Sequence, residues 1–108
     1  MEMTKQNLRN LDAVEEDYFR KHPEEMDYYI QEIFADYAQD RNAPALLASL
    51  RVIAKVKGMS NIAQEIGLTL RGLYKALSAQ GNPRFDNINA LMQSFGYQLM
   101  PQKIEGPA

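Results

Sequence analysis

Residues 59–78 read MSNIAQEIGLTLRGLYKALS, and this stretch carries the clearest local signals in the 108-residue chain. Gly67 stands where one helical run ends, and glycine adopts at little cost the left-handed conformation that often closes a helix. Thr69 follows, and its hydroxyl can cap the next helix by accepting a backbone hydrogen bond. The stretch therefore predicts two short helices joined by a turn at residues 66–68. Their apolar residues recur at helical spacing: Ile62, Ala63 and Ile66 in the first, and Leu73, Ala76 and Leu77 in the second.

The second of these helices leaves a polar side facing outward. In a helix-turn-helix, the second helix enters the major groove of DNA. Arg71 lies at its start, where a guanidinium could bond guanine O6 and N7 together, whereas Lys75 is expected to contact phosphates. Gly72 costs about 1 kcal/mol of helix propensity relative to alanine, which indicates either close approach to DNA or close packing on another helix. A solvated helix surface is the alternative interpretation of this polar side.

Charge is distributed unevenly along the chain. The formal net charge is only −2, but residues 1–44 hold eleven acidic and five basic side chains, a net charge of −6. Residues 45–108 hold seven basic and three acidic side chains, a net charge of +4. A basic surface on the second half would attract phosphates by releasing counterions. The asymmetry suggests that the two halves have different partners, although accident in a short chain also explains it.

The composition argues against several other classes of protein. With no cysteine there is no disulfide framework, thiolate nucleophile or thiolate metal site, and the single His22 cannot form a metal cluster alone. The carboxylates at residues 15–17 and 24–25 lack the nucleophile–base pair that catalysis requires. We therefore expect neither an enzyme nor a cofactor nor a metal. No apolar run approaches the roughly 20 residues of a membrane span, so a cytoplasmic location is expected.

The acidic half is predicted to be helical. Residues 1–11 are polar and expected to fray, whereas residues 12–21 suit a short helix within an N-terminal extension, 1–22. Pro23 then opens a helix to Asp40, with an apolar stripe at helical spacing. Such a stripe is usually core, but its aromatic content is typical of interfaces. The partner-binding candidates from both helices are Tyr18, Phe19, Met26, Tyr29, Ile30, Ile33, Phe34 and Tyr37.

Further helices are predicted on both sides of the opening stretch. Asn42 is placed to cap a helix that Pro44 opens and that Gly58 ends after residue 57. Residues 79–83 form a loop by every local signal. Another helix follows over residues 85–95, with Phe85 expected to face inward. Residues 97–100 alternate and could form a single strand, paired within the chain or with a second copy. We expect a flexible tail at 101–108.

These segments together resemble a known family. The runs GMSNIAQEIGLTLRGLYKAL and GNPRFDNINALMQSFG, within residues 44–99, resemble the phage-repressor-like helix-turn-helix fold of the XRE/Cro type. More closely, the chain is similar to the addiction-module antidote proteins, the HigA-like antitoxins. GLYKALS and GNP are the most specific pieces. The resemblance covers half of the chain strongly and residues 23–40 loosely, and it does not explain residues 1–22.

The resemblance implies an all-α fold. A five-helix DNA-binding domain at 44–100 would follow one or two N-terminal helices, with residues 23–43 serving partner binding or dimer packing. It also implies a homodimer that binds operator DNA, represses its own operon and neutralises a RelE/ParE-like toxin. Arg84 stands where a small hydroxyl residue usually caps the last helix, which weakens the cap but adds a charge that reaches phosphate. The DNA-binding candidates are Ser60, Asn61, Thr69, Arg71, Gly72, Lys75, Ser78, Asn82 and Arg84.

Two other functions remain open from the sequence alone. A phage-type transcriptional repressor would use its N-terminal helices only for dimerisation. A protein-interaction adaptor would keep the fold without binding DNA. In an antitoxin, the acidic half would instead face a basic, RNA-binding toxin.

Overall fold

Helices form the whole of the regular structure over residues 5–105, the part of the chain that the computed structural model describes; side chains are described from residue 13. No strand occurs in this range. None of its helices is long and apolar enough to cross a bilayer. In chain order the elements are α1 (Lys5–Lys21), a 3-10 turn η1 (Pro23–Glu25), α2 (Met26–Asp40), α3 (Ala43–Lys57), α4 (Met59–Ile66), α5 (Leu70–Ala76) and α6 (Phe85–Ser94).

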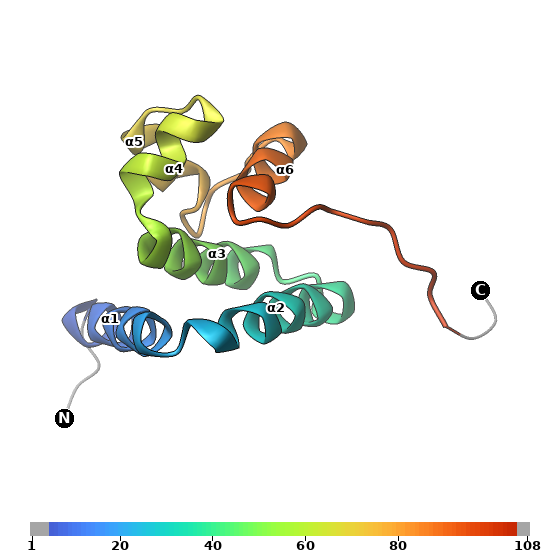
Figure 1. Ribbon diagram of the computed structural model, residues 1–108, viewed down its shortest axis with the longest axis horizontal. Coiled ribbons are helices and arrows are strands. Elements are labelled where there is room, and N and C mark those ends of the chain that lie inside the picture. Colours follow the sequence, from blue (N-terminus) through green and yellow to red (C-terminus); the bar gives the residue numbers. More distant parts are fainter. Residues whose placement is uncertain (1–4, 106–108) are drawn as a thin grey trace.

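Helix α3 lies between two groups of helices. Figure 1 shows α1 and α2 following one another along one side of α3, with α4, α5 and α6 on the other side. Both α1 and α2 pack on α3, whereas α4 packs on α3, α5 and α6. Helix α3 therefore lies between the helices of the acidic first half, α1 and α2, and the remaining helices of the basic second half.

The core is apolar throughout the described residues, with no buried polar or charged side chain among them. Leu50, Ile53 and Ala54 on α3 are completely buried. Residues from both helix groups join them in one cluster. Its buried members are Phe19, Met26, Ile30, Ile33, Leu47, Leu50, Val52, Ile53, Ala54, Met59, Ile62, Ala63, Leu73, Leu77, Leu91, Met92 and Phe95.

Local signals predicted the ends of α3 and α4 and the start of α5 correctly. The Asn42 side chain accepts a hydrogen bond from Ala45 N–H at the start of α3. Gly58 and Gly67 both have positive φ, 105° and 78°, and Gly67 ends α4 in the left-handed conformation. Thr69 Oγ1 accepts the Gly72 N–H at 2.9 Å and caps α5. The two short helices and the turn predicted from residues 59–78 are confirmed.

Four sequence-based expectations need correction. The helix predicted from Pro23 to Asp40 begins with a 3-10 turn, Pro23–Glu25, and is α-helical only from Met26. The first helix begins at Lys5 and is longer than the predicted 12–21. Phe85 does not face inward, because it is 72% exposed at the first position of α6. Residues 97–100 form no strand in the described part of the chain: Tyr97 and Leu99 pack against the core while Gln98 and Met100 face outward. The alternation therefore reflects which side chains contact the core, and it does not come from strand pairing.

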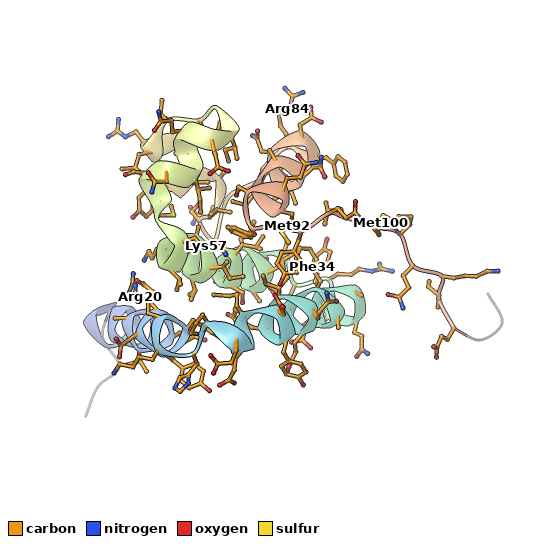
Figure 2. All side chains as sticks on the ribbon, in the orientation of Figure 1. Arg20, Phe34, Lys57, Arg84, Met92 and Met100 are labelled. Atoms are coloured by element: carbon orange, nitrogen blue, oxygen red, sulfur yellow. The ribbon has the colours of Figure 1, made fainter. Side chains whose placement is uncertain are left out.

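The C-terminal segment leaves the body beside an apolar hollow. Phe34 and Met92, labelled in Figure 2, both line that hollow, together with Leu99. The Tyr97 hydroxyl donates a hydrogen bond to the Asp27 carboxylate, which joins the segment to α2. Residues 101–105 have no regular structure. The remainder of the predicted tail, 106–108, and the first four residues lie outside the described range.

Candidate nucleic-acid and partner interfaces

One hollow on the surface gathers residues from α5, the following loop and α6. Gly81 brings the loop against α5, donating its N–H to the Ser78 carbonyl at 2.9 Å. A Cβ on Gly81 would lie only 2.2 Å from the Ala76 carbonyl oxygen, so only glycine fits there. Of the predicted DNA-binding residues, the hollow is lined by Gly72, Lys75, Ser78, Asn82 and Arg84.

The remaining DNA-binding candidates lie outside this hollow. Ser60 and Asn61 line a second hollow at the start of α4, with Lys55 and Tyr74. Arg71 is exposed and lines neither hollow. Thr69 is exposed too, but its side chain is engaged in the helix cap. The structure thus places the nine candidates around α5 without collecting them into one pocket.

Gly72 and Ser78 have structural roles that the sequence did not reveal. A Cβ on Gly72 would lie 3.0 Å from Thr69 Oγ1, so the missing side chain leaves room for the cap hydroxyl. Neither of the two predicted reasons for Gly72 included this one. The Ser78 hydroxyl donates to the Lys75 carbonyl at 2.8 Å. In this rotamer its proton is therefore not available to a phosphate.

The cap of α5 can be tested through stability. Thr69→Val keeps the side chain's shape but removes the oxygen that accepts the Gly72 N–H. We expect the free energy of unfolding to fall by about 1 kcal/mol, the usual loss at an N-cap. Urea denaturation followed by circular dichroism measures it. Thr69→Ser, which keeps the hydroxyl, should lose much less; equal losses in both variants would contradict the capping role.

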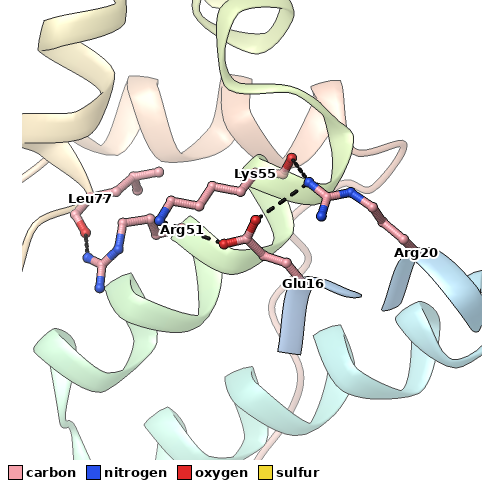
Figure 3. Close-up of polar contacts among 5 residues, drawn as sticks. All are labelled: Glu16, Arg20, Arg51, Lys55 and Leu77. Carbon is pink, nitrogen blue, oxygen red and sulfur yellow. Dashed lines mark hydrogen bonds and ion pairs between the residues drawn. The ribbon is translucent and has the colours of Figure 1, made fainter. Parts of the chain in front are cut away.

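A carboxylate from the acidic half reaches the basic half beside Ser60 and Asn61. Glu16 on α1 lines the second hollow, with Oε2 3.8 Å from Lys55 Nζ and Oε1 3.5 Å from Arg20 Nη2. Arg20 Nη2 also donates to the Lys55 carbonyl at 3.3 Å. Figure 3 shows this bridge between α1 and α3. Residues 35 and more apart in sequence meet here, so no local pattern could have predicted it.

Arg51 supports the end of α5. Its Nη1 donates to the Leu77 carbonyl at 2.6 Å, also drawn in Figure 3. Leu77 is the residue that closes α5. A cation at a helix C-terminus interacts favourably with the helix dipole. Arg51 therefore fixes α5 relative to α3, a role that no local sequence pattern indicates.

Four of the eight partner-binding candidates are corrected to core positions. Phe19, Met26, Ile30 and Ile33 are buried against this chain's own helices, so they offer a partner little surface. Two more are half-buried: Phe34 packs on the core, and the Tyr29 ring lies 4.5 Å from that of Phe19. The stripe on α2 is therefore mainly the face that meets α3. The exposed candidates are Tyr18 and Tyr37.

Tyrosines and carboxylates alternate on the outer surface of α1 and α2. Tyr18 donates its hydroxyl hydrogen bond to Glu25, and this bond, with the nearby negative charge, raises the pKa of Tyr18 above its ordinary value. A hydrogen bond to Glu32 likewise raises the pKa of Tyr28. Tyr28 is 73% exposed and was not among the candidates. Tyr28 stands between stripe residues in the sequence, so the helical spacing did not select it. An outward tyrosine flanked by carboxylates was nevertheless a usable signal of an exposed surface.

The turn between α1 and α2 brings together His22, Glu24 and Glu25, whose ligand atoms lie within 4.8 Å of one another. His22 Nδ1 lies 3.6 Å from Glu24 Oε2. Glu24 and Glu25 are exposed, and such groups commonly gather without an ion. The expectation of no metal stays a prediction.

Comparison with known proteins finds a family whose match covers most of the chain. The model of a family described as probable addiction module antidote protein matches residues 8–103. A relative from Haemophilus influenzae, described as an uncharacterized protein, is 38% identical over 80 residues. That match covers 74% of this chain and 78% of the relative. No solved structure matches the chain.

Proposed function

The chain belongs to the family of probable addiction module antidote proteins, and from that premise we propose that it neutralises a toxin and represses its own operon by binding operator DNA. Antidote membership implies a toxin partner. DNA binding is a further part of the proposal, in which α4, α5 and the loop at residues 79–84 contact the operator. The protein would act in the cytoplasm, as a homodimer on a palindromic site, by binding and without catalysis.

The observation that carries the DNA-binding proposal is the hollow beside α5. It is lined by two basic residues, Lys75 and Arg84, and by the amide side chains of Asn82 and Asn87, with no carboxylate among its lining residues. Cationic and amide side chains are among those that contact DNA phosphates. Arg71 stands exposed on the same helix, at the N-terminal end that reaches base edges in helix-turn-helix complexes.

Two substitutions separate base reading from phosphate contact. The DNA immediately upstream of the gene serves as the specific duplex, with a scrambled duplex of equal length for comparison. We expect Arg71→Ala to reduce the preference between them by about 1–3 kcal/mol, because a guanidinium that reads guanine is lost. Lys75→Ala should weaken both duplexes alike and lower the salt slope by about 1. Fluorescence anisotropy at several salt concentrations measures both effects.

Lys103→Ala is the matched control, since Lys103 is an exposed cation on the C-terminal segment and its removal changes the net charge equally. It should leave both affinities nearly unchanged. If neither Arg71→Ala nor Lys75→Ala changes binding, α5 does not read DNA. If the unmodified chain binds neither duplex, the adaptor becomes the better interpretation. A chain that binds DNA but has no toxin partner would be better interpreted as a phage-type repressor.

A further inference from the structure

The outer side of α1 and α2 carries a groove whose lining is acidic and aromatic. Its volume is about 340 Å³, and α1, η1, α2 and Ser49 of α3 line it. We call it the acid–tyrosine face, defined by Tyr18, Glu25, Tyr28, Glu32 and Asp36. Tyr18 and Tyr28 are 43% and 73% exposed. Large aromatic rings left in solvent beside a groove are typical of protein interfaces.

The charge of this face has one sign. Four carboxylates line the groove, including that of Glu15, and no lysine, arginine or histidine does. Near the end of α1, Lys21 lies 3.0 Å from Asp17, and His22 lies 3.6 Å from Glu24. An adjoining hollow, which shares Ile33, Asp36 and Ser49, adds Asp40 and Tyr37. The negative, tyrosine-bearing surface therefore extends along α2.

The tyrosines hold two of these carboxylates in place. Each hydroxyl donates to a glutamate, Tyr18 to Glu25 and Tyr28 to Glu32. A carboxylate oriented in this way keeps acceptor capacity for an incoming cation, because an ionised carboxylate has about four lone-pair sites. The adjacent ring faces attract cations as well. Arginine suits such a surface best, since its planar group bonds carboxylates through two N–H groups and also stacks on rings.

We propose that the acid–tyrosine face is the docking surface for the toxin, and that it receives an arginine- and lysine-rich surface of that protein. This inference rests on the proposed antitoxin function. A toxin that acts on RNA must itself present cations, and opposite potentials steer two proteins together. The face shares no lining residue with the hollow beside α5, and Figure 1 shows α1 and α2 across α3 from α5. Toxin and DNA can therefore be bound by different layers of the chain.

Charge reversal tests the proposal on the full-length chain. The probe is the protein encoded by the reading frame adjacent to this gene, purified separately, and isothermal titration calorimetry gives the dissociation constant. Glu32→Arg combined with Asp36→Arg should weaken binding at least about tenfold, because like charges then meet at the interface. The association rate of the unmodified pair should fall as salt rises.

The matched control reverses two exposed carboxylates elsewhere, Glu65→Arg with Glu105→Arg. It changes net charge by the same amount and should leave affinity within about threefold, as expected for rim or distant charges. If the first pair of reversals unfolds the chain, Glu32→Gln with Asp36→Asn keeps the shape and should still weaken binding. Tyr28→Ala should also weaken it, whereas Tyr74→Ala on α5 should not.

The outcomes are distinct. Loss of affinity only in the variants of the acid–tyrosine face supports the proposal. Unchanged affinity in those variants, with tight binding by the unmodified chain, overturns the docking surface and leaves the antitoxin function standing. No binding by the unmodified chain overturns both.

Discussion

Replacing Leu50 with alanine is expected to lower the free energy of unfolding by about 2–5 kcal/mol, the usual range for a buried leucine. Leu50 is completely buried on α3, the helix on which α1, α2 and α4 all pack. A cavity there would lie in the cluster that buried residues of both helix groups share. Chemical denaturation monitored by circular dichroism gives the value. A single cooperative loss of the helical signal would be consistent with both halves unfolding together.

Met100→Ala is the control for this loss of an apolar side chain. Met100 is 70% exposed, and surface substitutions usually stay within about 0.5 kcal/mol. A Leu50→Ala variant as stable as Met100→Ala would contradict the central position of α3.

Adding one methyl group at Gly81 is expected to cost about 3 kcal/mol, the upper part of the range for overpacked sites. The new Cβ would lie 2.2 Å from the Ala76 carbonyl oxygen and 2.8 Å from that of Lys75. Both atoms are backbone, so no side chain can rotate out of the way. The loop must move from α5 instead, carrying Asn82 and Arg84 with it. Gly81→Ala should therefore weaken DNA binding beyond its effect on stability.

Gln80→Ala is the matched control, because Gln80 is the exposed neighbour in the same loop. It should leave thermal stability close to that of the unmodified chain. A melting curve measures the stability of both variants, an anisotropy titration measures the DNA affinity of Gly81→Ala, and equal stability of the two variants would rule out the close packing of Gly81.

The sequence predicted best those features that adjacent residues determine. The caps at Asn42 and Thr69 and the left-handed Gly67 depend on atoms within a few residues, so their signals are local. Arg84 likewise makes no side-chain cap at the start of α6, as its chemistry indicated. The helix boundaries in the second half follow from such signals, which suffice to locate α5 and its polar side.

Contacts between distant residues could not be obtained in this way. The stripe on α2 was correctly identified as apolar, but periodicity cannot say whether its residues meet another helix or a partner. Ile30 and Ile33 meet the core, while Tyr28, outside the stripe, remains exposed. The Glu16–Lys55 and Arg51–Leu77 contacts join different helices. The alternation at 97–100 predicted a strand because half-burial produces the same pattern with or without a pairing partner.

The order in which the helices pack also has a kinetic consequence. Each main contact joins helices adjacent in sequence or separated by only one other: α1 and α2 with α3, α3 with α4, and α4 with α5 and α6. Closing short loops loses little chain entropy before the packing is gained. Helical proteins with such local contacts fold in roughly microseconds to milliseconds. The fast phase of refolding after a jump out of denaturant should therefore fall within that time.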